Sequence, residues 1–177
     1  ALDLLPEHDH LRRGPAAALL GLTYWADGRL EEAHRAVTEA MENFRKVNNP
    51  IFAISGAYFL ADMRAAQGRL HEAERSLQRS LDLAAEIGVS PPGMGDLYLG
   101  LAELYLQWND MKTAEAHLRK SEELDKEGGL PDWKFRHHLI QGLFLEREGQ
   151  FEEALRQVEE AQRLYYPTPI PEIRPLP

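Results

Sequence analysis

Residues 28–37 read GRLEEAHRAV and residues 68–77 read GRLHEAERSL, so the chain contains nearly the same sequence motif twice. Six of the ten positions are identical. Two looser copies follow, NDMKTAEAHL and GQFEEALRQV. The alanines that anchor the four copies are evenly spaced along the chain: Ala33, Ala73, Ala114 and Ala154. A fixed period of this kind indicates a repeat protein, in which one supersecondary unit is stacked several times.

Each copy predicts a helix with one small, closely packed face. In the first copy, the aliphatic Val37 follows the anchor alanine after four positions, and the small Ala40 follows three positions later. Leu77 and Ser80 stand at the same places in the second copy. Spacings of four and three place these residues on one face of a helix. Because the side chains are small, we expect a neighbouring helix to approach this face closely.

A second amphipathic run precedes each copy, so the repeating unit is a helix, a tight turn and a helix. The turn falls on Gly28, Gly68, Asn109 and Gly149, which are residue types that accept a left-handed backbone at a helix C-terminus. Asn49-Pro50 and Ser90-Pro91 each predict an N-cap followed by proline at the first helical position. We expect eight helices and no strands, with the helices at about residues 12–27, 30–47, 51–67, 70–87, 93–108, 111–127, 132–148 and 151–165.

These helices predict a repeat domain over residues 1–165, with repeats at about 12–49, 50–90, 91–130 and 131–165. The proline-rich residues 166–177 are expected to be an extended linker or tail, leading toward further repeats. The last helix carries apolar residues on the face meant for a following repeat. The end of the array is therefore a candidate surface for the tail to fold back on, or for self-association into a homo-oligomer.

Composition and charge exclude several classes of function. The chain of 177 residues has a net charge of −9, and its 20 basic residues are scattered among 29 acidic ones, so direct nucleic-acid binding is not expected. No apolar run approaches the ~20 residues that span a bilayer, and the N-terminal stretch does not resemble a signal peptide. We expect no membrane partner and a cytoplasmic location.

No residue set supports catalysis, a metal or a cofactor. The chain has no Cys and no Ser in a GxSxG turn. His71 begins HEAER, but Arg75 stands where the zinc signature has its second His. His137 and His138 are adjacent on a predicted helix and point about 100° apart, so they do not share one ion easily. His138 falls on the packed face, which favours a buried, hydrogen-bonded role. We expect a non-enzymatic protein.

The repeat resembles the tetratricopeptide repeat (TPR), whose pattern has a small residue and an aromatic residue before the turn. The first repeat matches best, through Leu20, Gly21, Tyr24, Gly28, Leu30, Ala33, Val37 and Ala40. The second departs at Arg64, where an aromatic residue is expected, and the fourth departs at His138 and Gln141. The resemblance implies an all-α, right-handed superhelical TPR-like solenoid of about four repeats, with a period of about 40 residues.

A narrower resemblance covers nearly the whole chain. The segments LPEHDHLRRGPAAALLGLTYWADGRLEEAHRAV, NNPIFAISGAYFLADMRAAQGRLHEAERSLQRSLDLA and PPGMGDLYLGLAELYLQWNDMKTAEAHL are similar to the repeat region of MalT-like regulators of the LuxR type. Those regulators also carry a STAND-class NTPase and a helix-turn-helix, and we find neither a P-loop nor a basic recognition helix here. The resemblance implies a sensor in signal transduction and transcription regulation, which binds an inducer or regulatory protein.

In this fold the first helices of successive repeats line a concave groove. The candidate binding residues are Leu22, Trp25, Tyr58, Asp62, Leu99, Glu103, Gln107, Arg136, Leu143 and Arg147. Trp25 and Tyr58 are anchors of the kind that recognise a protein or peptide, or stack on a small inducer such as a sugar; packing inside the array is the equal alternative. The alternative function is a stand-alone TPR adaptor that scaffolds protein–protein complexes. The flanking coding sequence distinguishes the two functions.

Overall fold

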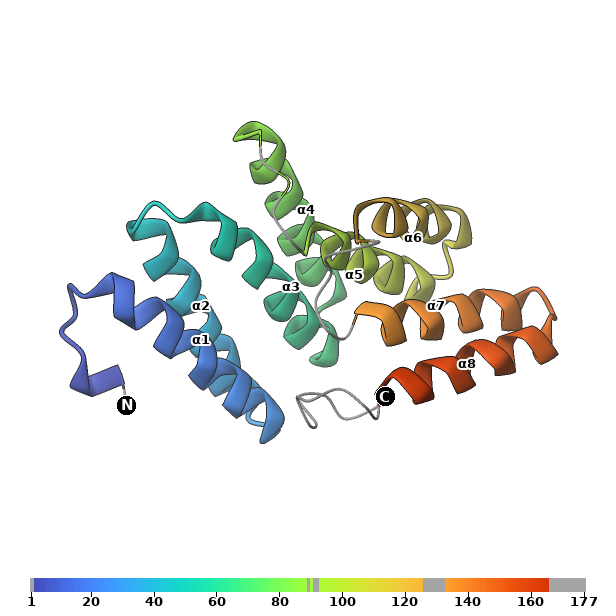
Figure 1. Cartoon of the computed structure of the whole chain (residues 1–177), viewed down its shortest axis with the longest axis horizontal. Helices are drawn as coiled ribbons and strands as arrows, with labels where there is room; N and C mark the ends of the chain where they lie inside the picture. The colour runs from blue at the N-terminus through green and yellow to red at the C-terminus, as the bar shows by residue number, and fades with distance from the viewer. Residues whose placement is uncertain (1, 89, 91–92, 126–132, 166–177) are drawn as a thin grey trace. The chain divides into compact units, whose positions relative to one another are not determined.

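The computed structural model describes residues 2–88, 90, 93–125 and 133–165 (Figure 1). A short 3-10 turn, Leu2–Leu4, precedes eight α-helices, and the described residues contain no strand. The helices are α1 (His10–Ala26), α2 (Leu30–Lys46), α3 (Pro50–Ala66), α4 (Leu70–Glu86), α5 (Met94–Gln107), α6 (Met111–Asp125), α7 (Trp133–Arg147) and α8 (Phe151–Tyr165). The prediction of an all-α helical-repeat fold with eight helices is confirmed. The helix ends differ from the predicted ones by at most two residues.

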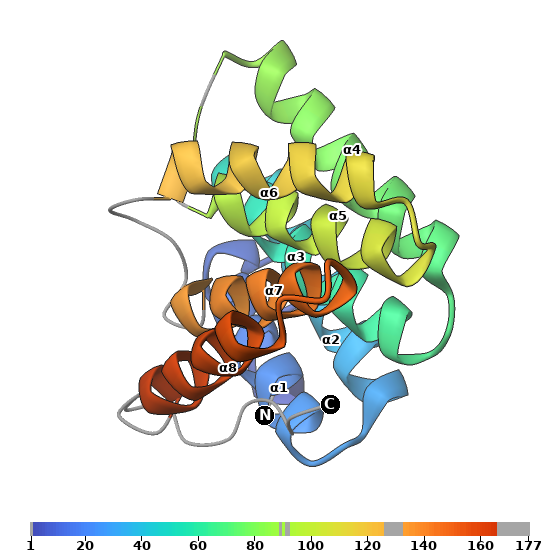
Figure 2. The ribbon, with the colours of Figure 1, turned by 90° about the vertical axis from the view of Figure 1, so that its right-hand side faces the viewer.

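The chain divides into two compact units, with the boundary between residues 91 and 92. Unit 1 contains the hairpins α1–α2 and α3–α4, and α2 also packs against α3. Unit 2 contains the hairpins α5–α6 and α7–α8, and α5 also packs against α7. Figure 2 shows the paired helices of the hairpins from a second direction. Each unit is thus a pair of helix-turn-helix repeats that bury apolar faces against each other.

The turns inside the hairpins have the predicted left-handed backbone. Gly28, Gly68 and Gly149 have φ angles of 72°, 75° and 77°, and Asn109 has a φ angle of 60°. A glycine takes this conformation without steric cost, and asparagine is among the residues that tolerate it best. These residues reverse the chain within a few positions, so the two helices of each hairpin can pack along their length.

The two predicted N-caps have different outcomes. Pro50 is the first residue of α3 and follows Asn49, as predicted, although the Asn49 side chain makes no capping hydrogen bond. The prediction for Ser90 is wrong, because α5 begins only at Met94, directly after Gly93 with a φ angle of 86°. Pro91 and the tail at 166–177 lie outside the described residues. So do Gly128-Gly129 and Pro131-Asp132, which the sequence predicts to end one helix and to open the next.

The small residues on the second helices are packed as predicted, but Val158, the aliphatic residue at the corresponding place in α8, is 43% exposed. Ala33, Ala73 and Ala114 are fully buried. At Gly21 of α1, a Cβ atom would lie 2.5 Å from a Val37 methyl group of α2. The Val37 side chain therefore packs directly against the backbone of α1. Such an approach is open only to glycine at this position. It holds the first helix of the hairpin directly over the aliphatic stripe of the second.

Unit 2 has its own hydrophobic core. The core joins α5, α6 and α7 through the buried residues Leu99, Ala102, Leu106, Ala114, Leu118, Trp133 and Ile140. The Trp133 indole nitrogen donates a 2.8 Å hydrogen bond to the Ser121 hydroxyl. A buried indole N–H needs such an acceptor, so Ser121 has a chemical role besides its small size. Across the described part of the chain, no helix has the length and apolar character required to cross a bilayer.

Candidate functional site

The ten residues predicted to line a groove differ in their exposure. Trp25, Tyr58, Leu99 and Arg136 are buried, with exposed fractions of 9%, 2%, 0% and 2%. Leu22, Asp62 and Glu103 are half-buried, and Gln107, Leu143 and Arg147 are exposed. Burial favours the packing alternative for Trp25 and Tyr58 over ligand contact. Binding by the set as a whole stays a prediction.

Two of the predicted groove residues pair with each other in unit 2. The Arg136 guanidinium of α7 lies 2.5 Å from the Glu103 carboxylate of α5, and Glu103 is about one-third exposed. The sequence predicts both as binding residues and gives no sign that they pair with each other. A pair this close neutralises both charges, and it links the first helices of the two repeats in this unit.

A polar network joins α6 to α7 at the start of α7. The His137 ring stacks on the Trp133 ring with centroids 4.8 Å apart, and its Nε2 atom lies 2.6 Å from a Glu122 carboxylate oxygen. Burial lowers the pKa of His137, against the opposite effect of Glu122. His138, the histidine predicted to be buried, is only half-buried and shares a 2.7 Å hydrogen bond with Gln157. The described residues contain no group of three or more His, Asp or Glu side chains placed to hold a metal ion.

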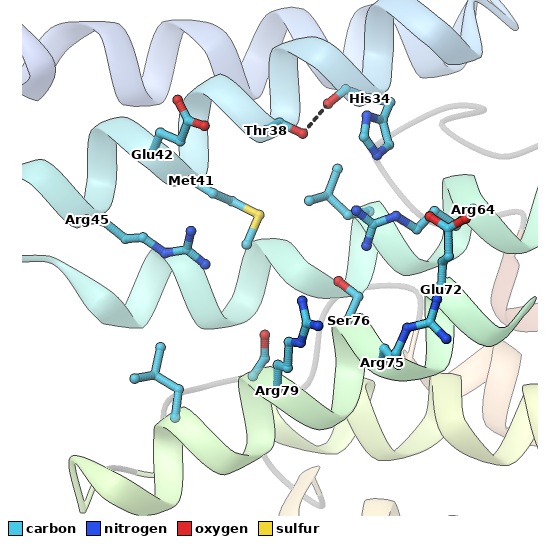
Figure 3. Close-up of a pocket in the computed structure, with 13 residues that line it drawn as sticks. His34, Thr38, Met41, Glu42, Arg45, Arg64, Glu72, Arg75, Ser76 and Arg79 are labelled. Atoms are coloured by element: carbon cyan, nitrogen blue, oxygen red, sulfur yellow. Dashed lines mark hydrogen bonds between the residues drawn. The ribbon is translucent and has the colours of Figure 1, made fainter. Parts of the chain in front are cut away.

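A cavity of about 440 Å³ lies in unit 1 between α2, α3 and α4 (Figure 3). We call it the α2–α4 pocket. Its lining carries four arginines from three helices: Arg45 of α2, Arg64 of α3, and Arg75 and Arg79 of α4. Cavities of roughly 300–1,000 Å³ are the size that proteins use for small ligands.

The four arginines of the pocket face only two carboxylates, Glu42 and Glu72. Glu72 is engaged outside the lining, since the Arg69 Nε atom donates a 2.9 Å hydrogen bond to it. The structure shows no ion pair for any of the four arginines among the described residues. The pocket is therefore positively charged, although the chain as a whole has a net charge of −9.

Two nitrogen atoms in the pocket are buried without a hydrogen-bond partner in the described part of the chain. They are Nε2 of His34 and Nε of Arg64. Burial lowers the pKa of Arg64, and the nearby Arg69, Arg79 and Arg75 lower it further, while Glu72 raises it. Burial also lowers the pKa of His34, followed by the effect of Arg64 and Arg69. Buried polar nitrogens of this kind are costly unless a hydrogen-bond partner satisfies them.

The remaining lining of the pocket mixes hydroxyl and apolar groups. The Thr38 hydroxyl donates a 2.8 Å hydrogen bond to the His34 carbonyl of its own helix (Figure 3). The other contributors are the hydroxyls of Ser76 and Ser80 and the apolar side chains of Met41, Leu60 and Leu83. Charged donors beside an apolar wall suit a ligand that has both an anionic group and a less polar body.

Sequence reasoning missed this pocket, although two signals were present. Arg64 stands where the first and third repeats have Tyr24 and Tyr105, so a charge replaces an aromatic ring of the TPR pattern. Arg75 and Arg79 are four residues apart, which places two like charges side by side on one face of α4. The sequence does not show that Arg45 of α2, which is far from Arg75 and Arg79 along the chain, lines the same pocket.

A comparison with family models decides the family. The model described as the MalT-like TPR region matches residues 1–175. The chain belongs to this family. Among solved structures, this MalT-like TPR region is similar to BtubC (BKLC) from P. vanneervenii, with a TM-score of 0.67 and 17% sequence identity over 99% of this chain and 71% of that one. At that identity the similarity concerns the fold alone. A comparison with curated proteins finds no match.

Proposed function

We propose that this MalT-like TPR region is the non-catalytic sensor domain of a LuxR-type transcriptional regulator. In this role it takes up an inducer or a regulatory protein, and it relays the binding to an NTPase module and a helix-turn-helix module elsewhere in the regulator. Such a regulator works in the cytoplasm, where its DNA is. The observation that carries the proposal is the family match over residues 1–175.

The described structure supports a binding role in two ways. Stacked helix hairpins expose long helix faces while each repeat packs only on its neighbours, which is how repeat proteins form binding surfaces. Three members of the predicted groove set, Gln107, Leu143 and Arg147, remain exposed in unit 2. Leu143 is 46% exposed, and a large apolar side chain in water contributes to affinity when a partner covers it.

The proposal is tested in the full-length protein. Effectors are first identified by the rise they cause in the melting temperature of this chain. NTP hydrolysis and promoter binding by the full-length protein are then measured with and without each effector. We expect an effector that stabilises the chain to change both outputs. If stabilising effectors change neither output, the sensor role is wrong.

A matched pair of leucine variants separates the predicted groove from the rest of the surface. Leu143→Ser changes an exposed residue of the predicted set, and Leu155→Ser changes a leucine of α8 that is 59% exposed and outside the set. For an effector that uses the groove, we expect Leu143→Ser to weaken binding several-fold and Leu155→Ser to leave it unchanged, measured by calorimetry. The flanking coding sequence tests the adaptor alternative, because an adaptor gene would encode no P-loop and no helix-turn-helix.

A further inference from the structure

The positive charge of the α2–α4 pocket belongs to one place in the array and is not a general property of the repeats. The residues of α8 that correspond to Arg75 and Arg79 of α4 are Arg156 and Glu160. Arg156 lies 2.7 Å from Glu153 in an ion pair, and Glu160 pairs with Arg163. The same helix face in the fourth repeat is thus neutralised by partners of its own.

Arg64 shows the same contrast on α3. The corresponding positions in the other repeats are Tyr24, Tyr105 and Leu145, which are aromatic or aliphatic. An arginine here is half-buried, and its Nε atom is buried with no acceptor in the described part of the chain. A guanidinium group loses hydration free energy when it is buried. A hydrogen bond to an acceptor compensates for this loss, and a negatively charged acceptor does so best.

Three helices therefore direct arginines that form no ion pair in the described part of the chain toward one cavity, which holds four arginines against two carboxylates (Figure 3). Arginine presents a planar fork of N–H donors that matches the oxygens of phosphate and carboxylate. Guanidinium groups that reach one space from α2, α3 and α4 surround an anion from several directions. That arrangement suits a tetrahedral group with an acceptor oxygen on every side better than a planar carboxylate, which one fork satisfies.

We propose that the α2–α4 pocket is a binding site for a small molecule that carries a phosphate group. Arg64 and Arg79 bind the phosphate oxygens, His34 supplies a further donor, and the apolar side chains of Met41 and Leu60 contact the body of the ligand. The regulatory meaning of such a ligand rests on the proposed function, because only a sensor domain relays its binding. Binding itself is a property of this chain and is tested without the other modules.

The test uses the full chain and three probes at constant ionic strength: inorganic phosphate, inorganic pyrophosphate and succinate. Thermal melting and calorimetry are the measurements. We expect pyrophosphate and phosphate to bind saturably and raise the melting temperature, with succinate much weaker. Equal effects of all three probes, or an effect that follows ionic strength alone, would mean that the pocket does not recognise phosphate and would overturn the proposal.

Four variants assign the binding to the pocket. Arg79→Gln removes one exposed pocket cation, and Arg35→Gln removes an exposed cation of α2 that does not line the pocket. Since hydrogen bonds between charged groups contribute about 1.5–3 kcal/mol, Arg79→Gln should weaken pyrophosphate about ten-fold or more, while Arg35→Gln should not. Arg64→Tyr restores the residue of the first and third repeats, and Arg64→Gln is its polar counterpart.

We expect Arg64→Tyr to melt at the same temperature as the wild type or higher, and to lose the stabilisation by pyrophosphate. This combination distinguishes a binding residue from a structural one, since a structural Arg64 would lower the melting temperature when replaced. Loss of binding in Arg35→Gln to the same degree as in Arg79→Gln would refute the site. So would tight binding of a poly-glutamate peptide to a chain that ignores pyrophosphate, because the pocket would then serve an acidic peptide.

The outcome for the pocket is separable from the outcome for the regulator. If the chain binds pyrophosphate through Arg64 and Arg79 but the pocket variants leave promoter binding of the full-length protein unchanged, the site exists and the sensor role fails. If the chain does not bind any phosphate probe while another effector still controls promoter binding, the pocket proposal fails and the sensor role stands.

Discussion

Small side chains at a few positions decide how closely the helices of this protein pack. Ala73 of α4 and Ala114 of α6 are fully buried at the anchor position of their repeats. Ala116, two residues further along α6, is exposed, as is Ala85 near the end of α4. The same residue type thus serves as a close-packing contact at one position and as a solvent-exposed helix former at another.

Leucine substitutions at these alanines measure the difference. Ala114→Leu adds a branched side chain where no space exists, so we expect a loss of about 1–3 kcal/mol in the free energy of unfolding. Ala116→Leu should change it by less than about 0.5 kcal/mol, because leucine is nearly as good a helix former as alanine. Ala73→Leu and Ala85→Leu are the equivalent pair in unit 1. Urea denaturation gives the four values, and similar losses at the buried and exposed alanines would contradict the assigned packing face.

Packing between whole elements adds contacts that the repeat pattern does not specify. In the pattern, Ser121 is only one of the small residues that follow the anchor alanines. In the structure its hydroxyl accepts the buried indole N–H of Trp133, and so it ties α6 to the first residue of α7. Trp133 in turn stacks on His137, which pairs with Glu122 of α6. A polar network therefore connects the third repeat to the fourth inside unit 2.

A double-mutant cycle tests the bond between these two helices. Ser121→Ala leaves the buried indole N–H without an acceptor, and we expect it to destabilise the chain by about 1–3 kcal/mol. In the background of Trp133→Phe, which has no N–H to satisfy, the same Ser121→Ala change should cost much less. Thermal or urea denaturation of the four proteins gives the coupling energy. Additive effects would mean that Ser121 contributes only its small volume.

At the scale of the whole molecule, the half-buried His34 of unit 1 and the buried His137 of unit 2 link stability to pH. The pKa of His34 in unit 1 and that of His137 in unit 2 are both lowered, with burial as the largest cause in each. The groups that act on His34 are Arg64, Arg69, Glu31 and Glu72, and those that act on His137 are Glu122 and His138. As the pH falls through the unfolded value near 6.5, the unfolded chain takes up protons before the folded chain does.

We therefore expect the free energy of unfolding to fall as the pH is lowered from about 7.5 to about 5.5, because the folded chain resists the protonation of these two histidines. His34→Gln and His137→Gln should each flatten this slope, whatever they do to stability at pH 7.5. His71→Gln is the control, because His71 is exposed on α4. Urea denaturation at several pH values gives the slope for each protein. A slope that is unchanged in the double variant would show that neither histidine is responsible.

The sequence by itself determines the local structure of this protein. The regular repeat period, the small–aliphatic–small stripes and the turn residues Gly28, Gly68, Asn109 and Gly149 predict eight helices within two residues of their ends. Each of these signals acts over a single hairpin, where neighbours in space are also neighbours in sequence. Membership of the MalT-like TPR family can be recognised from the sequence for the same reason, because it depends on the order of these motifs along the chain.

The tertiary structure decides what the exposed and buried side chains do. Helical spacing places Trp25 and Tyr58 on a face but does not say whether another element covers it, and the structure buries both. The repeat pattern likewise gives no sign that Glu103 and Arg136 pair with each other. The packing of α5 against α7 brings them together. The α2–α4 pocket depends on three helices at once: Arg45, Arg64 and Arg79 are distant in sequence and meet only because α3 packs against both α2 and α4. Electrostatic and packing partners of this kind are long-range in sequence, so only the folded chain reveals them.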